Sequence, residues 1–440
     1  MPPSDPHLKR VITTPQLWGI TVGLVISGEY FGWNYGWHTS GTVAFLGSTL
    51  LVTALYVSFI FSYTELTAAI PSAGGAFSYA RRAFGPTGGF VAGFATLVDF
   101  LMAPPAIAYA LGSYTHFLNP ALPVVPVAVG CYGVFIALNW FGIKGSARFS
   151  LWVTVLSVLE LLVFMVLVVP HFSVERVLAH NPAQVSAGAV FAGIPYAMWF
   201  FVAIEGAAMV AEEVRNPERT IPRGYVSAIL TLVFLALGVM ILSAGVGDWR
   251  QLSQIDYPLP EALAMALGRE SAWSKVFASL GLFGLIASFH CNTISYSRQL
   301  YALAREGYLP GTLATLHPRY HTPQRALLAG GVAGLLAIFS GTTQAIIVLS
   351  VLGAVVMYGI SMASLLVLRR REPDLPRPFR APLYPWLPGL ALVLSVVCMV
   401  AIIYYNPGVS GLFFGGLILG LGLFLTVGYR YVKEAVQPPT

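Results

Sequence analysis

The sequence has 440 residues, of which 57% are hydrophobic and only 10% are charged, and its formal net charge is +6. A soluble domain carries about 25% charged residues, so this composition excludes a soluble enzyme or binding domain and indicates a polytopic membrane protein. The basic residues are spread over short loops instead of gathering on one face, which excludes a nucleic-acid partner. The three cysteines lie in apolar stretches without metal-ligand spacing, and we find no nucleotide loop or nucleophile–base motif. We therefore expect no enzyme activity, no cofactor and no metal centre.

Twelve apolar segments approach the length of about 20 residues that a helix needs to cross a bilayer. They predict an all-α membrane protein with twelve transmembrane helices. The apolar run that follows residues 1–14 lacks a small-residue cleavage site, so we expect a retained first helix and not a signal peptide. The segments are 16–40, 43–69, 87–117, 121–140, 149–169, 188–211, 225–246, 272–303, 325–340, 344–368, 385–405 and 410–431.

Lysine and arginine in the loops predict the orientation, because cytoplasmic loops are enriched in both. If the N-terminus is placed inside, only four of the 24 lysines and arginines fall on the outer side: Arg176, Arg250, Arg269 and Lys275. The sequence thus predicts a multi-pass protein of the inner (cytoplasmic) membrane with both termini cytoplasmic. Charged residues near the inner face are expected to form the salt bridges of an inner gate or to anchor loops, and not to bind substrate: Glu65, Arg81, Arg82, Glu212, Glu213 and Arg215.

Two of the predicted helices, the first and the sixth, carry interruptions at mid-membrane. In residues 16–40 a Ser–Gly pair precedes Glu29, and in residues 188–211 a proline and a glycine flank the aromatic stretch that leads to Glu205. Interrupted helices at corresponding places of two halves point to a transport site at the bilayer midplane. A carboxylate at that depth is costly, which makes Glu29 the leading functional residue.

Three long stretches resemble signatures of the amino acid–polyamine–organocation superfamily. They are residues 65–81 (ELTAAIPSAGGAFSYAR), 205–222 (EGAAMVAEEVRNPERTIP) and 297–310 (SRQLYALAREGYLP). The resemblance implies a leucine-transporter-type fold with alternating access, in which helices 1–5 and 6–10 form a 5+5 inverted repeat and two helices follow. Within the superfamily, the run GEYFGW at residues 28–33 is most similar to the ethanolamine permeases.

This resemblance divides the chain into five parts and locates the substrate site. The parts are a cytoplasmic tail (1–14), the first repeat (15–169), the second repeat (170–368), helices 11 and 12 (369–433) and a second cytoplasmic tail (434–440). Amino-acid members carry a Gly-Ser-Gly turn in helix 1, whose backbone N–H groups hold the substrate carboxylate at a half-helix N-terminus. Aligned on the following phenylalanine, that triplet falls on Ser27, Gly28 and Glu29, so a carboxylate occupies its third position.

The carboxylate at position 29 bears on the choice of substrate. Two like unit charges about 4 Å apart cost on the order of 4 kcal/mol at an effective dielectric near 20. We therefore expect a cationic substrate without a carboxylate. Glu29 would pair with its ammonium group or satisfy the N–H groups of the turn itself.

Aromatic residues around both breaks can wall this site. Cation–π contacts are worth roughly 0.5–2 kcal/mol each, and Trp199 matches the aromatic gate position of cationic amino-acid antiporters in the superfamily. The alternative is that these rings are core or belong to the aromatic belt at the membrane surface. We expect Trp33, Tyr35 and Trp37 to line only the outer half. The predicted substrate-binding set thus adds Tyr30, Trp199, Phe200, Phe201 and Ala203 to the residues of the first break.

Asp99 and Glu205 complete that set. Asp99 lies about 12 residues from the inner end of helix 3, or roughly 18 Å at 1.5 Å per residue, which is near the midplane. It fits a cationic substrate, a proton carrier, or a plain hydrogen bond between helices. Glu205 belongs to the superfamily signature, so it either satisfies the unwound backbone of helices 1 and 6 or binds the cation.

The candidates for proton coupling are Glu29, Asp99, Glu160 and His290. A buried carboxyl or imidazole can titrate near neutral pH, although a lone histidine in a helix more often only forms a hydrogen bond. Some proton-coupled members carry a lysine in helix 5, but residues 149–169 contain no lysine or arginine. In helix 8, oxygen atoms for a loosely matching sodium site come from Ser288, Asn292 and Thr293.

Together these features predict a secondary active transporter that imports a small organic cation by alternating access. Ethanolamine is the leading substrate, and the residues named above allow coupling to protons. The alternative is an amino acid or polyamine transporter of the same superfamily in which Glu29 carries the proton. A third interpretation is a nutrient sensor that does not transport, but such a sensor would carry a soluble signalling domain. The expected partners are the amine and the lipid bilayer.

Overall fold

The structure is a computed structural model that describes residues 10–140, 146–182, 184–269, 271–320 and 322–435. Much of the two predicted tails, residues 1–9 and 436–440, therefore lies outside the described residues. The described chain is helical, and Ile12 pairs with Val214 in an isolated bridge. The α-helices are α1 (Thr14–Val25), α2 (Ser27–Tyr30), α3 (Tyr35–Ala69), α4 (Ala76–Leu118), α5 (Val124–Trp140), α6 (Ser146–Val168), α7 (Val174–Leu178), α8 (Ala187–Trp199), α9 (Pro217–Ala244), α10 (Trp249–Leu252), α11 (Pro258–Leu267), α12 (Ala272–Arg305), α13 (Gln324–Ser340), α14 (Thr343–Arg371), α15 (Trp386–Tyr405), α16 (Pro407–Leu423) and α17 (Tyr429–Ala435). Short 3₁₀ or π elements are η1 (Val169–His171), η2 (Ile204–Glu213), η3 (Gly311–Ala314) and η4 (Phe424–Gly428).

Nine helical spans in the described ranges are long and apolar enough to cross a membrane, and α5, α11 and α13 are shorter apolar helices. Each predicted segment coincides with a helix or with a broken helix, which confirms an all-helical membrane protein. The first segment is divided between α1, α2 and the start of α3, and the sixth between α8 and η2. The count of twelve crossings and the inverted repeat stay predictions.

The first two predicted segments meet at a break in the backbone. Gly41 has φ of 71° and ψ of 173°, which are not helical values, so α3 consists of two helices joined at a kink there. Residues 35–40 therefore precede the break, as the predicted bounds 16–40 and 43–69 require. Within the first segment the chain also turns after α2, where Gly32 has a positive φ of 92°.

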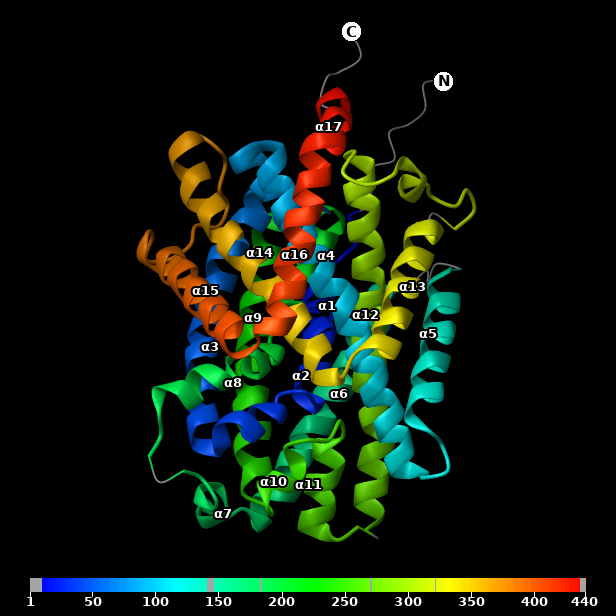
Figure 1. Cartoon of the computed structure of the whole chain (residues 1–440), viewed down its shortest axis with the longest axis vertical. Coiled ribbons are helices and arrows are strands. Elements are labelled where there is room, and N and C mark those ends of the chain that lie inside the picture. The colour runs from blue at the N-terminus through cyan, green and yellow to red at the C-terminus, as the bar shows by residue number, and fades with distance from the viewer. Residues whose placement is uncertain (1–9, 141–145, 183, 270, 321, 436–440) are drawn as a thin grey trace.

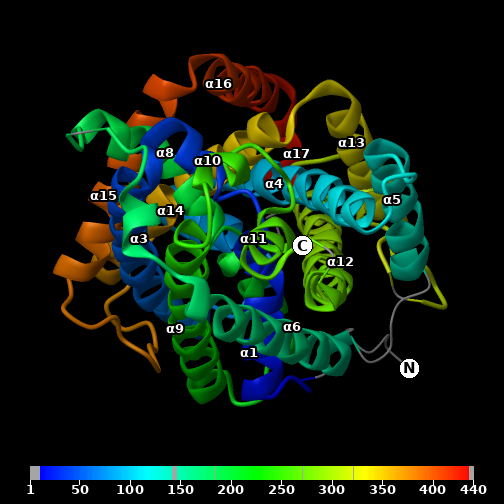
Figure 2. The ribbon, with the colours of Figure 1, turned by 90° about the horizontal axis from the view of Figure 1, so that it is seen from below.

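The centre of the bundle is built around α4, which packs against both α14 and α12, while α3 packs against α8 and α9. The contact between α4 and α14 depends on Gly353, because a Cβ atom there would stand 2.5 Å from the carbonyl oxygen of Ala95. Seen along the long axis of the molecule, α5, α15 and α16 stand at the rim (Figure 2). The two backbones of α4 and α14 thus meet where Asp99 lies.

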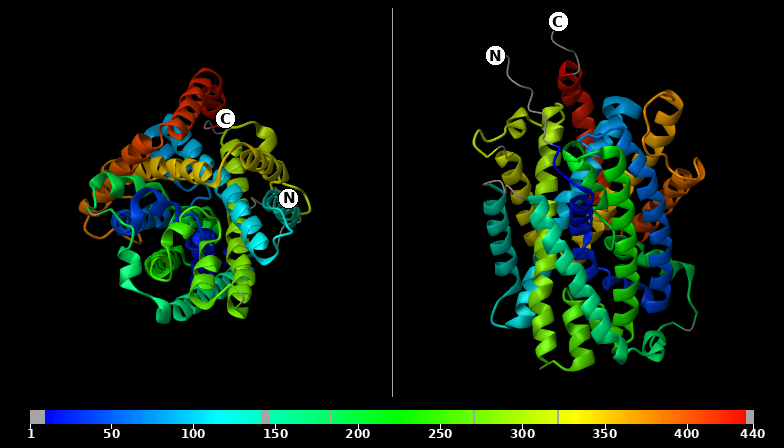
Figure 3. Two further views of the ribbon diagram at one scale, coloured as in Figure 1. Left: turned by 60° about the horizontal axis from the view of Figure 1, so that its bottom comes forward. Right: turned by 180° about the vertical axis from the view of Figure 1, so that it is seen from behind.

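The two ends of the described chain lie on the same side of the bundle. Figure 1 and Figure 3 show α17 and the start of α1 at one end, and Figure 1 places α7, α10 and α11 at the other. This arrangement is the one that the predicted topology requires. Which end faces the cytoplasm stays a prediction.

Candidate substrate site at two helix breaks

The first break lies between α1 and α2. The helix ends at Val25, which leaves carbonyl groups of its last turn without helical partners. Side chains of α12 supply donors: Ser288 Oγ donates to the carbonyl oxygen of Leu24 at 2.7 Å and Asn292 Nδ2 at 3.0 Å. Ser27 Oγ lies 2.8 Å from Ser288 Oγ. The structure therefore places Ser27, Ser288 and Asn292 together as support for the broken backbone.

The second break separates α8 from η2. The α-helix ends at Trp199, and Ala203 then adopts a left-handed conformation with φ of 74°, which is uncommon for a residue with a Cβ atom. The two breaks touch each other. A Cβ atom at Gly28 would lie 2.3 Å from the carbonyl oxygen of Trp199, so only glycine fits at this crossing.

Glu29 follows Gly28 directly, and its side chain is completely buried. Neither carboxylate oxygen has a hydrogen-bond partner among the described residues. The backbone is better satisfied, since the Trp33 indole donates to the Glu29 carbonyl oxygen at 3.1 Å. A buried carboxylate without a donor or a cation is costly. A cationic ligand would therefore gain more here than at a carboxylate that is already paired.

Aromatic rings from both breaks pack against one another beside this turn. The rings of Phe31 and Trp199 meet edge to face at 5.7 Å, and those of Trp33 and Phe200 stack at 5.5 Å with an interplanar angle of 14°. All four side chains are at most 1% exposed. Trp33 is thus part of the buried wall between the breaks and not only a lining of the outer half. Phe201 packs on Tyr56 of α3, with ring centroids 5.1 Å apart.

Tyr30 points away from this wall and joins Glu160 of α6. Its hydroxyl donates to Glu160 Oε2 at 2.8 Å, and Gly284 of α12 leaves room for the ring. The hydroxyl of Tyr114 donates to the carbonyl oxygen of Tyr30 at 3.0 Å. Glu160 is therefore linked to the first break through Tyr30, while no hydrogen bond joins it to Glu29 in the described structure.

Asp99 and Glu205 both accept hydrogen bonds from α14. The Ser350 hydroxyl donates to Asp99 Oδ1 at 2.7 Å, and the Tyr358 hydroxyl donates to Glu205 Oε2 at 3.0 Å. Asp99 and Glu205 are 0% and 2% exposed. Their other carboxyl oxygens have no hydrogen-bond partner among the described residues. The structure thus connects both candidates to the same helix.

His290 lies apart from these groups. Its ring lines an apolar cavity of about 880 Å³ between α4, α5, α6 and α12, and Nδ1 lies 3.3 Å from Asn139 Nδ2. Thr293 donates to the carbonyl oxygen of Phe289 in its own helix at 2.8 Å. Within the described ranges, no group of three or more His, Cys, Asp or Glu side chains could hold a metal ion.

One end of the molecule is closed over the breaks by the loop between α10 and α11. Tyr35 donates a short hydrogen bond to Asp256 Oδ1, and Thr343 donates to Asp256 Oδ2 at 3.2 Å. Asn34 Nδ2 donates to the carbonyl oxygen of Leu252 at 2.6 Å. Burial raises the pKa of Asp256, which lies in the loop and outside the spanning helices.

The other end carries a cleft. The cleft has a volume of about 530 Å³ and is lined by residues that include Ile12, Arg148 and Arg298. A small cavity of about 40 Å³ shares Ile20, Val210 and Arg298 with it and is also lined by Leu24 and Gly206. The cleft and the cavity thus extend from this surface toward the last turn of α1 and the start of η2.

Four of the six charged residues expected at the inner face form ion pairs at this end, whereas Glu212 accepts from the Ala73 N–H at 2.8 Å and Arg215 donates to the carbonyl oxygen of Arg10 at 3.4 Å. Arg81 pairs closely with Glu306, Arg82 Nη2 lies 2.6 Å from Glu372 Oε2, and Arg298 Nη1 lies 3.1 Å from Glu213 Oε1. Buried Glu65 accepts from Arg369 Nη2 at 2.6 Å, and its Oε1 lies 3.1 Å from Arg377 Nε in a second ion pair. The hydrogen bond that Arg82 donates lowers the pKa of Glu372.

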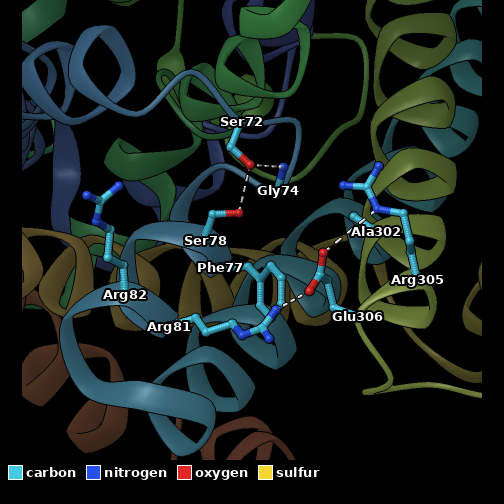
Figure 4. A pocket seen from close by; sticks show the side chains of 9 residues that line it. All are labelled: Ser72, Gly74, Phe77, Ser78, Arg81, Arg82, Ala302, Arg305 and Glu306. Atoms are coloured by element: carbon cyan, nitrogen blue, oxygen red, sulfur yellow. Dashed lines mark hydrogen bonds and ion pairs between the residues drawn. The ribbon is translucent and has the colours of Figure 1, made fainter. Parts of the chain in front are cut away.

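A second pocket at this end, of about 320 Å³, lies between the first turns of α4 and the last turn of α12 (Figure 4). Figure 4 shows Arg81 and Arg305 on either side of Glu306, while Ser72 bonds to Ser78 and to the Gly74 N–H. Its charged groups already pair with protein side chains. It lies at the helix ends and not at the breaks, so it is separate from the candidate substrate site.

The sequence missed several members of the site. Ser350, Tyr358 and Tyr56 were not singled out, although hydroxyl groups within apolar helices are potential partners for buried carboxylates. Asp256 was not singled out either. The sequence of a helix does not show which of its faces packs against a residue far away in the chain.

A bundle of membrane-spanning helices, with two broken helices crossing beside a buried carboxylate and a cleft at one end, is the architecture of a membrane transporter. The chain belongs to the amino acid permease family, which it matches over residues 12–423. It is 23% identical to the branched-chain amino acid permease of Bacillus subtilis, over 98% of this chain and 95% of that protein. It is 27% identical to the cystine/glutamate transporter of Homo sapiens (93% and 83%) and 24% identical to the methylthioribose transporter of Bacillus subtilis (92% and 90%). The superfamily resemblance is confirmed, and the closer likeness to ethanolamine permeases stays a prediction.

Proposed function

We propose that this transporter imports a small organic cation, with ethanolamine as the leading substrate. The observation that carries the proposal is Glu29, a completely buried carboxylate whose two oxygens have no hydrogen-bond partner in the described structure. An ammonium group would supply both donors and the opposite charge. A substrate carboxylate about 4 Å away would instead cost on the order of 4 kcal/mol at an effective dielectric near 20.

The surrounding groups support a small ligand. Gly28 holds the two breaks in contact, and the rings of Trp33 and Phe200 stack beside the turn. Aromatic faces attract cations by roughly 0.5–2 kcal/mol each. We propose Ser27, Gly28, Glu29, Trp199, Phe200 and Ala203 as substrate-binding residues. Tyr30 and Phe201 then act mainly by packing the breaks against α6 and α3.

The proposed cycle is alternating access in a leucine-transporter-type fold. Residues 15–169 and 170–368 would form the inverted repeats, 369–433 the two last helices, and both termini would be cytoplasmic. The closed contact of Asp256 with Tyr35 and Thr343 would then face outward, and the cleft at Arg298 would face the cytoplasm. In this assignment the structure corresponds to a state closed to the outside.

The second candidate is an amino acid transporter in which Glu29 carries a proton. Two relatives named as an amino acid permease and a cystine/glutamate transporter favour it. A protonated Glu29 would be neutral and would not repel a substrate carboxylate. The two candidate functions therefore differ in the protonation state of Glu29 that binds substrate: the ionised carboxylate favours a cation, and the protonated carboxyl tolerates an amino acid.

Uptake into proteoliposomes separates them. Wild-type protein, Glu29→Gln and a control with an exposed acid changed, Glu175→Gln, are compared for ethanolamine and for alanine, with pH and sodium gradients imposed separately. We expect Glu29→Gln to abolish ethanolamine uptake and the control to leave it intact. Ethanolamine uptake that is unchanged in Glu29→Gln, or alanine uptake that exceeds it in the wild type, would overturn the proposal.

A further inference from the structure

The apolar cavity at His290 lies apart from the two helix breaks and has no role in the proposed transport cycle. It has a volume of about 880 Å³, and its walls come from α4, α5, α6 and α12. Figure 2 shows α5 at the rim of the bundle beside α12. We call this cavity the rim cavity. Its volume falls in the range of 300–1,000 Å³ that is typical of sites for small organic ligands.

The rim cavity is bordered by side chains that face lipid. Three of its apolar lining residues are exposed at the surface of the protein: Val134 to 57%, Leu138 to 45% and Phe149 to 45%. Phe149 belongs to α6, which is long and apolar enough to cross a membrane, and Trp152 one turn further along that helix is 72% exposed. Apolar side chains exposed at this depth contact the acyl chains of the bilayer. The molecules next to the cavity are therefore lipids.

Water does not suit the interior of this cavity. A buried water molecule needs two to four polar partners, and apolar cavities that lack them stay dry. The hydroxyl of Thr115, which lines the cavity, already donates to the carbonyl oxygen of Leu111 in its own helix at 2.6 Å. An apolar chain needs no such partners and would regain the contacts that an empty cavity loses.

The length of the rim cavity matches one acyl chain. On α5 its lining residues run from Val127 to Leu138, which is roughly 16 Å at 1.5 Å per residue. One leaflet fills half of the hydrocarbon core of a bilayer, or about 15 Å. On α12 the lining residues Leu282, Ile286 and His290 are spaced four apart, so they form a straight stripe on one face of the helix.

His290 provides a hydrogen-bond donor at one end of this stripe. Asn139 Nδ2 lies 3.3 Å from His290 Nδ1 and donates to the carbonyl oxygen of Phe135 at 2.8 Å. An amide nitrogen only donates, so Nδ1 accepts and the neutral ring carries its hydrogen on Nε2. Nε2 is buried without a partner among the described residues, and the side chain is only 2% exposed. Because Asn139 is the next-to-last residue of α5, this donor lies near the end of that helix.

We propose that the rim cavity binds one acyl chain of a membrane glycerophospholipid and that an ester carbonyl oxygen of this lipid accepts a hydrogen bond from His290 Nε2. The ester stands where the acyl chain meets the headgroup, so it lies at the end of α5 while the chain follows the stripe on α12. The headgroup stays at the membrane surface. The site is independent of which substrate the protein carries.

A lipid bound here would support the first helix break from behind. Ser288 and Asn292 of α12 donate to the carbonyl oxygen of Leu24 at that break. His290 is two residues from each of them, which is about half a turn of an α-helix, so it lies on the opposite face of α12. A ligand on that face holds the helix against the break. Since it binds the folded protein, it also raises the unfolding temperature.

Two glycines of α5 offer a matched pair of variants. A Cβ atom at Gly130 or at Gly133 would have no other atom within 4 Å, but of the two only Gly130 lines the rim cavity. Gly130→Phe therefore fills part of the cavity without a clash, and Gly133→Phe adds the same side chain outside it. A third variant, His290→Phe, keeps a ring but removes the donor.

Native mass spectrometry of the purified full-length protein counts the lipids that each variant retains. The probes are dioleoyl phosphatidylglycerol and its ether-linked analogue, which lacks the carbonyl oxygens. We expect the wild type and Gly133→Phe to retain one more ester lipid than Gly130→Phe at the same lipid concentration. The wild type should bind the ester lipid about 2–10-fold more tightly than the ether lipid, as one net hydrogen bond predicts, and His290→Phe should bind both equally. The added ester lipid should raise the unfolding temperature of Gly133→Phe more than that of Gly130→Phe.

Three results would overturn the proposal. Equal numbers of retained lipids in Gly130→Phe and Gly133→Phe would show that no lipid occupies the cavity. Equal binding of the ester and ether lipids by the wild type, or an ester preference that persists in His290→Phe, would show that His290 does not bind the carbonyl. Displacement of the phospholipid by an equal concentration of cholesterol would show that the cavity prefers a different class of lipid. The glycine pair and the wild-type comparison leave His290 intact, so they test the site even if His290→Phe fails to fold.

Discussion

The crossing of the two helix breaks at Gly28 predicts a sharp effect of one added methyl group. In Gly28→Ala, the Cβ atom would lie 2.3 Å from the carbonyl oxygen of Trp199 and 3.2 Å from Phe200 Cα. Both obstacles are backbone atoms, so no side-chain rotation relieves them. The two breaks must move apart, and overpacking of this kind costs about 1–3 kcal/mol. If the whole cost falls on the closed site, the affinity for the amine falls by about 5–150-fold.

A matched control comes from α16. A Cβ atom at Gly415 would have no other atom within 4 Å, so Gly415→Ala changes the same residue type in a spanning helix without a clash. Alanine is favoured over glycine in a helix by up to about 1 kcal/mol, so this variant should be neutral or slightly more stable. Thermal unfolding in detergent and amine counterflow are measured for both variants. Equal unfolding temperatures and equal apparent affinities in the two variants would refute the account of the crossing.

Two further predictions concern the ends of the molecule. Glu65→Gln removes a buried carboxylate that accepts from Arg369 at 2.6 Å and from the Ala381 N–H at 2.7 Å and that forms an ion pair with Arg377 at 3.1 Å. Breaking such a buried pair costs about 3–5 kcal/mol. The unfolding temperature should therefore fall, whereas Asp248→Asn at the exposed pair with Arg250 should leave it unchanged. An unfolding temperature of Glu65→Gln equal to that of Asp248→Asn would contradict this. At the other end, burial raises the pKa of Asp256 in the closed loop. Protonation of Asp256 therefore stabilises the closed loop. This stabilisation is fully present below the pKa that Asp256 has in the open loop, and it is lost as the pH rises through the higher pKa of the closed loop. Labelling of a cysteine placed at buried Ser253, in a chain without its three native cysteines, should become faster with pH relative to the same label in Asp256→Asn. A pH dependence that is the same with and without Asp256 would argue against it.

Much of the helical scaffold around the site could be predicted from the sequence, because helix breaks and loop charges depend on short stretches of residues. The Ser–Gly pair before Glu29 and the stretch from Pro195 to Gly206 predicted two interrupted helices, and the structure interrupts both there. Apolar length predicted the helices, since a bilayer demands it. The loop arginines near the inner face predicted ion pairs, which the structure forms.

Side-chain direction at the breaks could not be predicted. Tyr30 and Glu29 are adjacent in sequence, but Tyr30 reaches Glu160 while Glu29 has no partner. Their directions depend on how far the chain rotates at the break, and no periodic pattern records that rotation. Trp33 was expected in an outer lining, because the sequence does not show that Gly32 turns the chain back toward Phe200.

The partners of Asp99 and Glu205 were also beyond the sequence. Ser350 reaches Asp99 because α4 and α14 approach closely at Gly353. A glycine in the middle of a long apolar helix was the available signal, since it often marks close packing in membranes. Such a glycine indicates that another backbone packs closely against the helix, but it does not show which one.

Equilibrium binding of ethanolamine to the purified transporter, measured by calorimetry for the wild type, Glu29→Gln and Glu175→Gln, tests the central claim most directly. A charge pair at about 4 Å contributes on the order of 4 kcal/mol at an effective dielectric near 20, which is roughly a thousandfold in Kd. The account predicts that Glu29→Gln loses measurable binding while Glu175→Gln binds like the wild type. Ethanolamine binding of equal affinity in the wild type and in Glu29→Gln would contradict it.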